Sequence, residues 1–252
     1  PQPKLFVLED AARARVELAH DAAAVMRLVV PAQPIQMVWP SQEALASLIQ
    51  RRYDFLIGYQ DAAYAQAYQH LVHRVQAAER ALGGTKLTEA VARNLFKLMA
   101  YKDEYEVARL HTDPAFLQKI NGMFEGDYTL NYHLAPPLIA KTNAKGELQK
   151  QKFGPLMLTG FKVLKHFKWL RGTALDVFGY TEERRTERAL IAQYQSSVDT
   201  MLGELNASNH ALAVEMARIP EQIKGFGHVK ARNLAAARDK WHSLKAQWSA
   251  PN

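Results

Sequence analysis

Apolar residues recur every three or four positions over most of the chain, a spacing typical of amphipathic helices. Residues that begin or end helices separate these runs. Gly83-Gly84 ends the longest run, and Ser41 and Thr181 stand where helices begin. The expected helices span Glu9–Val29, Gln42–Leu82, Thr85–Leu110, Pro114–Phe124, Pro155–Leu170, Glu182–Leu205 and His228–Gln247. A further short helix is expected from Ser208 or Asn209 to just before Pro220. The helix Gln42–Leu82 can break at Gly58.

One short stretch, Tyr128–Leu134, instead alternates apolar and polar side chains and predicts a β-strand. Its partner is expected at Leu138–Ala140 or at Lys150–Phe153, on either side of a loop that turns at Gly146. The predicted fold class is therefore mainly α, a helical bundle with one long helix and a small β-hairpin or two- to three-stranded sheet.

Prolines mark a domain boundary near the start of the chain. The segment Pro31–Pro40 has the composition of a linker. We expect residues 1–34 to be the tail of a preceding domain, with its linker, and residues 35–252 to form a mainly helical C-terminal domain. The chain begins Pro-Gln-Pro without a methionine or a signal-peptide pattern, so we interpret it as a fragment of a longer protein.

The chain contains no cysteine, so its own residues form no disulfide, thiolate zinc site or cysteine-ligated iron–sulfur cluster. No apolar run approaches the roughly 20 residues that cross a bilayer. Phosphate-binding glycine loops, zinc-protease helices and nucleophile elbows are also missing from the sequence. We expect no catalytic residue, cofactor or metal in this chain and no membrane partner. The lack of cysteine fits a reducing compartment, and we expect a cytoplasmic location.

The formal net charge is +7, and it is concentrated in one segment. Eight basic residues and a single acid, Glu147, lie between Lys141 and Arg171, which accounts for the whole excess. Within it, one side of the helix Pro155–Leu170 carries a candidate partner-docking patch. Three interpretations remain open: a solvated face, a surface for an acidic protein, or a site for nucleic acid or lipid headgroups. Nucleic acid and lipid headgroups are the least favoured of these partners. The candidate patch consists of Lys162, Lys165, Lys168 and Arg171.

The helix Thr85–Leu110 is apolar almost all round and is therefore expected to be buried. Buried charges need partners. Within this helix, Lys102 can pair with Glu106, and Glu106 can pair with Arg109. The four charged residues Lys102, Asp103, Glu106 and Arg109 form either a buried ion-pair network or an interface with other domains.

A third candidate lies at Gly225-Phe226-Gly227, just before the last helix. A helix N-terminus there can hold a phosphate or carboxylate, with Lys224, His228 and Lys230 as the nearest charges. The alternative is a backbone turn that needs glycine conformations.

Five stretches of the chain together resemble the C-terminal part of the fused indolepyruvate:ferredoxin oxidoreductases. In order along the chain they are Tyr59–Tyr64, Ala92–Leu110, Gly172–Asp176, Arg184–Ile191 and Pro220–Asn233. The resemblance extends from about Ser41 to the last helix, and residues before Pro40 match the tail of the preceding oxidoreductase domain more weakly.

The resemblance implies that the parent enzyme decarboxylates arylpyruvates oxidatively to acyl-CoA and passes the electrons to ferredoxin. It implies thiamine diphosphate, magnesium and iron–sulfur clusters in upstream domains. By this resemblance the present chain is a non-catalytic domain for packing, assembly or partner docking, and it is inactive alone. Its partners would be the upstream domains, ferredoxin and further copies of the parent. The alternative is a free-standing basic module that binds an acidic protein or nucleic acid.

Overall fold

The computed structural model describes residues 44–124, 126, 128–134, 149, 151–225 and 227–249, without the side chains of residues 227 and 228. The predicted helix Glu9–Val29, the linker Pro31–Pro40 and the domain boundary at residue 34 lie outside the described residues, as does the candidate strand Leu138–Ala140. The described chain is mostly helical with one two-stranded antiparallel sheet, which confirms the predicted fold class.

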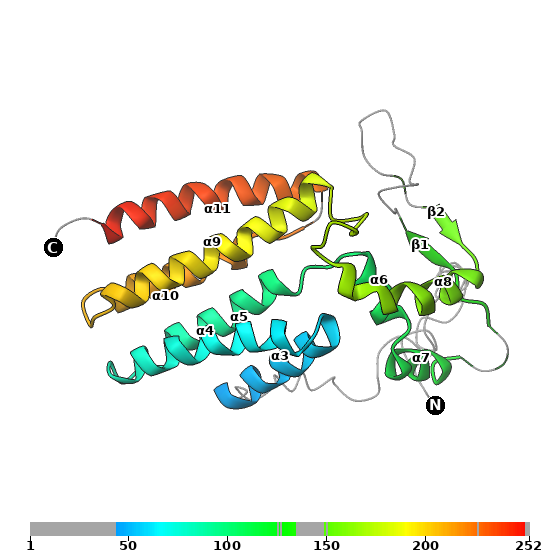
Figure 1. Ribbon diagram of the computed structural model, residues 1–252, viewed down its shortest axis with the longest axis horizontal. Helices are drawn as coiled ribbons and strands as arrows, with labels where there is room; N and C mark the ends of the chain where they lie inside the picture. The colour runs from blue at the N-terminus through cyan, green and yellow to red at the C-terminus, as the bar shows by residue number, and fades with distance from the viewer. Residues whose placement is uncertain are drawn as a thin grey trace, which may run out of the picture.

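Long helices form a bundle that makes up one end of the molecule (Figure 1). Its core is continuous, and the largest fully buried side chains in it include three tyrosines, Tyr59, Tyr68 and Tyr194. Each tyrosine hydroxyl donates to a backbone carbonyl, so these polar groups are satisfied inside the core. The helices of the bundle are α3 (Leu45–Tyr59), α4 (Ala62–Arg80), α5 (Lys86–Met99), α9 (Glu182–Glu204), α10 (His210–Ala217) and α11 (Gly227–Trp248), with the short 3₁₀ helix η2 (Ile219–Gln222) between the last two.

The prediction of a single helix over Gln42–Leu82 is wrong. The helix breaks at Gln60 and Asp61, just beyond the glycine at which a break was allowed, and gives α3 and α4. The backbone of Asp61 is extended, and its carboxylate accepts a hydrogen bond from the Tyr64 N–H at 2.8 Å. This N-cap makes the break favourable although the apolar spacing continues across it.

The expected helix Thr85–Leu110 is also two helices. The first is α5, and the second is α6 (Glu104–His111). The carboxylate of Asp103 accepts the N–H of Glu106 at 2.8 Å and caps α6. Asp103 is therefore an N-cap at a bend, not a residue in the middle of a helix.

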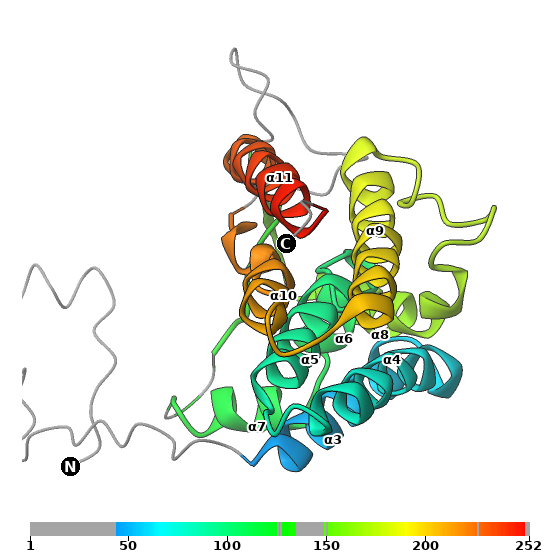
Figure 2. The ribbon, with the colours of Figure 1, turned by 90° about the vertical axis from the view of Figure 1, so that its left-hand side faces the viewer.

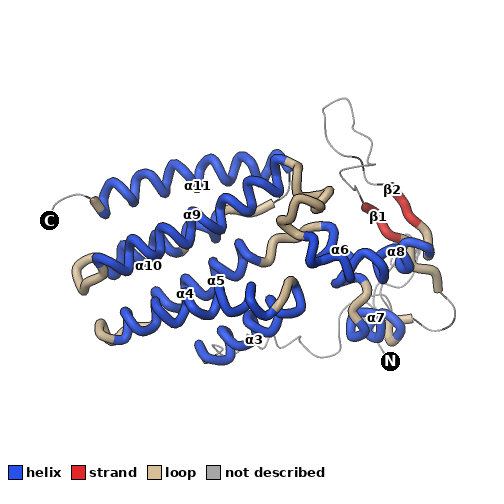
Figure 3. The backbone as a smooth tube through the Cα atoms, in the orientation of Figure 1, coloured by secondary structure: helices blue, strands red, loops and turns tan. Residues whose placement is uncertain are grey.

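A smaller cluster forms the other end of the molecule, and Figure 3 shows its strands beside short helices. Strand β1 (Tyr132–Leu134) pairs with β2 (Gln151–Phe153), with Tyr132 opposite Phe153. This confirms the second of the two candidate partner strands. The helices of the cluster are α6, α7 (Pro114–Asn121), α8 (Leu156–Leu164) and the 3₁₀ helix η1 (Lys165–Leu170). The expected helix Pro155–Leu170 thus changes from α to 3₁₀ geometry at Lys165.

An aromatic group fills the core of the smaller cluster. The ring of His111 stacks on Phe161 with centroids 5.3 Å apart, and Tyr132 meets both rings edge-on. Burial lowers the pKa of His111, and the nearby Lys102 lowers it further. The imidazole therefore stays neutral in this core near pH 7. None of the described helices is both long enough and apolar enough to cross a membrane.

Candidate functional site

The guanidinium of Arg171 lies at the junction between the bundle and the smaller cluster. Its Nε is 2.5 Å from one carboxylate oxygen of Asp103, and its Nη2 is 2.9 Å from the other. Both side chains are almost fully buried, with exposed fractions of 5% and 3%. A two-point Arg–Asp pair in this setting fixes both side chains in one geometry.

The remaining nitrogen of Arg171 binds the end of α3. Its Nη1 donates to the Tyr59 carbonyl at 2.7 Å and to the Gln60 side-chain oxygen at 2.6 Å. The guanidinium also lies 3.7 Å above the centre of the Tyr59 ring. Arg171 thus joins three points of the chain, namely the end of α3, the start of α6 and the end of η1.

Lys168 adds a second cation at the end of α3. Its ammonium donates to the carbonyl oxygens of Gly58 at 2.8 Å and Ile57 at 3.2 Å. Cations stabilise the carbonyl end of a helix, where the last oxygens have no partner within the helix. Burial lowers the pKa of Lys168, and the neighbouring Arg109 and Arg171 lower it further.

Asp176 fixes the turn that follows Arg171. Its carboxylate accepts the Gly172 N–H at 2.9 Å and the Tyr105 hydroxyl at 3.2 Å. The backbone of Gly179 passes so close that a β-carbon there would collide with the Asp176 carboxylate. Arg188 then donates to the Gly179 carbonyl at 2.7 Å and connects this turn to α9.

Arg184 extends the network toward the last helix. It pairs with Glu187 within α9, lies 3.7 Å from Glu104 of α6 and donates to the Lys102 carbonyl at 3.1 Å. Glu187 in turn pairs with Lys230 of α11. A set of charged and polar residues therefore links α3, α6, α9 and α11. We call this set the junction network: Tyr59, Gln60, Asp103, Glu104, Tyr105, Arg171, Asp176, Arg184, Glu187, Arg188 and Lys230.

The electrostatics of the junction network keep its central cation charged. Burial lowers the pKa of Arg171, but its hydrogen bond to the Asp103 carboxylate and the surrounding charges raise the pKa above its ordinary value, so the guanidinium stays charged. Burial raises the pKa of the Tyr59 hydroxyl well above its usual range. Both oxygens of Asp103 are occupied by donors. These contacts suit a structural connection, because the charges of Arg171 and Asp103 are paired with each other.

The structure places the four candidate residues Lys102, Asp103, Glu106 and Arg109 in different surroundings. Asp103 is buried and paired, although its partner is Arg171. Glu106 and Arg109 pair with two hydrogen bonds of 2.7 Å, and Arg109 lies 4.7 Å from the centre of the Phe55 ring. Lys102 is exposed and forms no ion pair with any described residue, so the expected Lys102–Glu106 pair is wrong. The bend at Asp103 is the reason, because it ends the helical spacing assumed for that pair.

The candidate patch Lys162, Lys165, Lys168 and Arg171 is not one basic surface. Arg171 is buried in the junction network, and Lys168 is bound to the end of α3. Of the four residues only Lys162 is exposed, and Lys165 is half-buried at the start of η1. The change from α to 3₁₀ geometry alters the helical spacing on which the shared face depended.

The candidate anion site at Lys224, His228 and Lys230 loses one of its charges. Lys230 pairs with Glu187 and lies 3.5 Å from Glu183, while Lys224 is exposed. The side chain of His228 lies outside the described atoms. Gly225 has a φ of 93°, which favours the glycine-turn alternative at this position.

Large apolar side chains are exposed beside the junction, at the end of α8, in η1 and in the segment before α9. Trp169 is 60% exposed and Leu175 is 67% exposed. Figure 2 shows this segment, in yellow-green, projecting from the body of the molecule. We call the following six residues the apolar segment: Val163, Phe167, Trp169, Leu175, Val177 and Tyr180. The sequence analysis did not predict the apolar segment, because it assigned this part of the chain by its lysines.

Comparisons with known proteins add one finding. A protein-family model described as a family of unknown function, DUF6537, matches residues 45–243. Searches of curated proteins and of solved structures returned no match. The matched range begins at α3 and includes the whole junction network. Among the described residues, no three histidine or carboxylate side chains are grouped as a metal site would require.

Proposed function

Since the chain belongs to DUF6537, a family of unknown function, we propose a role for it from its own surface and network. It is a non-catalytic assembly domain that docks, through the apolar segment, onto the upstream domains of an indolepyruvate:ferredoxin oxidoreductase polypeptide. The observation that carries the proposal is the exposure of six large apolar side chains within residues 163–180. Soluble proteins seldom leave such a group uncovered, and it is typical of an interaction surface.

The resemblance to those oxidoreductases supports the choice of partner. Each of the five stretches that carry it contributes to the junction network, through Tyr59, Asp103, Asp176, Arg184 and Lys230 respectively. The network holds η1 and the turn after it against the bundle. It thereby presents the apolar segment in a defined geometry.

In this proposal the chemistry belongs to the parent enzyme. Thiamine diphosphate, magnesium and iron–sulfur clusters would be held by upstream domains, in a cytoplasmic oligomer that reduces ferredoxin. The alternative, a free basic module for an acidic protein or nucleic acid, gains no support from the candidate patch, because two of its four cations are engaged within the fold.

The test compares the isolated chain with the full-length gene product that contains it. We expect amide hydrogen exchange in residues 163–180 to slow in the full-length protein, because the apolar segment becomes covered. Trp169→Glu should restore fast exchange there. Met123→Glu, at an apolar residue 48% exposed at the end of α7, is the matched control and should change nothing. Equal exchange in both forms, or a gene product that begins at this domain, would contradict the proposal.

A further inference from the structure

Helices α9 and α11 run in the same direction along one side of the bundle and are connected near both ends (Figure 1). Near their N-termini, Lys230 of α11 pairs with Glu187 of α9. Near their C-termini, the indole N–H of Trp248 donates to the Glu204 carboxylate at 2.7 Å. Between these two contacts a groove of about 660 Å³ separates the helices.

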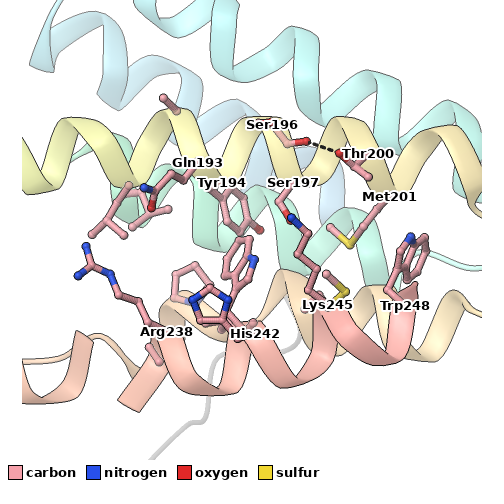
Figure 4. A pocket seen from close by; sticks show the side chains of 18 of the residues that line it. Gln193, Tyr194, Ser196, Ser197, Thr200, Met201, Arg238, His242, Lys245 and Trp248 are labelled. Atoms are coloured by element: carbon pink, nitrogen blue, oxygen red, sulfur yellow. Dashed lines mark hydrogen bonds between the residues drawn. The ribbon is translucent and has the colours of Figure 1, made fainter. Parts of the chain in front are cut away.

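The floor of this α9–α11 groove is apolar and aromatic (Figure 4). Tyr194 and Trp241 meet edge-on with centroids 6.4 Å apart, and the buried Met201 and Met216 also line the space. The Tyr194 hydroxyl already donates to the Ala217 carbonyl at 2.8 Å. An apolar occupant could therefore lie on this floor without leaving a buried hydroxyl unsatisfied.

The two rims of the groove differ in charge. Arg238, His242 and Lys245 line the α11 rim at spacings of four and three residues, and all three are exposed. None of their side chains forms a hydrogen bond or ion pair with another described residue, whereas Lys240 on the same helix pairs with Glu215 at 2.8 Å.

The α9 rim is neutral over most of its length, with small polar residues such as Ser196, Ser197 and Thr200. Among the described lining residues the only carboxylate is Glu204, and it accepts the Trp248 indole N–H. The groove therefore offers an anion uncompensated positive charge along one edge only.

We propose that the α9–α11 groove binds an anionic amphiphile, a long-chain carboxylate, with its alkyl chain on the aromatic floor and its carboxylate at Arg238, His242 and Lys245. The groove volume lies within the range of small-molecule sites, about 300–1,000 Å³. The lining from Leu234 to Trp248 is about 21 Å long, which suits an extended chain. A neutral amphiphile would leave the cationic rim without a partner.

The test titrates dodecanoate, below its micelle-forming concentration, into the full chain and follows binding by calorimetry. We expect saturable binding of one molecule per chain. Dodecanol has the same chain length without the charge, and it should bind more weakly. Equal affinity for dodecanol would overturn the role of the cationic rim, and binding that never saturates would overturn the site.

Two variants test whether the ligand binds in the groove. Ser197→Trp puts a large side chain into the space between the helices without removing any core residue, and it should abolish binding. Arg238→Gln with Lys245→Gln should weaken binding by about 2- to 30-fold, the range for two exposed charge pairs.

The matched control is Arg232→Gln, an exposed cation on α11 outside the groove lining, which should bind as the unchanged chain does. Circular dichroism checks that each variant remains helical. Unchanged affinity in a folded Ser197→Trp chain would refute the proposal. The groove shares no residue with the apolar segment, so this result is independent of the docking proposal.

Discussion

The buried pair of Asp103 and Arg171 is the contact whose loss we expect to destabilise the chain most. Asp103 performs two tasks, since it neutralises Arg171 and caps α6. Asp103→Ser removes the charge but keeps an oxygen that can accept the Glu106 N–H. Stranding a buried cation costs roughly 3–5 kcal/mol, so Asp103→Ser should lower the free energy of unfolding by about that much. Asp103→Ala should cost about 1 kcal/mol more, because the cap is lost as well.

The assay is urea unfolding followed by circular dichroism. With a slope of about 2–3 kcal/mol per molar urea, the expected loss moves the midpoint by about 1–2.5 M. A midpoint for Asp103→Ser within about 0.2 M of the unchanged chain would refute the reasoning, because it would mean that water reaches Arg171 and replaces the carboxylate.

A double variant separates the stranded charge from lost packing. Asp103→Leu fills the space but still strands Arg171 and loses the cap of α6, so it should be about as destabilised as Asp103→Ala. Adding Arg171→Met removes the stranded charge and should recover part of the loss, since an apolar pair can replace a buried ion pair at little cost. Recovery is incomplete because the Tyr59 carbonyl loses its donor. A double variant less stable than Asp103→Leu alone would show that the charge is not the cause.

Three further predictions follow from the described contacts. Burial lowers the pKa of His111 below 6.5, so the unfolded chain binds the proton more tightly and the stability of the fold should decrease as the pH drops below about 6.5. His111→Phe should remove this pH dependence from the urea midpoints measured between pH 7 and 5. A pH dependence that persists in the variant would contradict the role of His111. Burial opposes ionisation of the buried Glu79, but hydrogen bonds from Thr88, the Leu87 backbone and His210 lower its pKa overall. Its contribution to the stability of the fold is therefore present above about pH 4.5 and lost on acidification. The Glu79→Gln chain should unfold at a lower urea concentration than the unchanged chain at pH 7, and the two midpoints should differ less at pH 3. Lys168→Met should lose about 0.5–2 kcal/mol of stability at the end of α3, and Lys162→Met, at an exposed lysine, should stay within about 0.5 kcal/mol; equal midpoints for the two would contradict the assigned role of Lys168.

Local chemistry in the sequence predicted the local structure well. Thr181 caps α9, as expected from its position, and the helix expected from Pro114 is found as α7, capped by Asp113. The alternating stretch at Tyr128–Leu134 contains β1, and its partner strand is one of the two expected. Such features depend on neighbours within a few residues, so the sequence carries them directly.

The breaks in the long helices could not be found from periodicity, because the apolar spacing continues through Asp61 and Asp103. Only the cap geometry of these two residues reveals them. The burial of Asp103 was predictable from its apolar neighbours. Its partner Arg171 was not, since 68 positions separate them along the chain. The same limit applies to the α9–α11 groove, which two helices form together.

The Asp103–Arg171 pair also stands where the chain leaves the bundle and where it returns. Residue 103 precedes α6, residue 171 follows η1, and the whole smaller cluster lies between them. The pair therefore holds together the two ends of this inserted segment. Doubling the length of a closed loop costs only about 0.6 kcal/mol. The segments that connect α7, β1, β2 and α8 can thus lengthen or shorten among related proteins while the bundle and the Asp103–Arg171 pair stay the same.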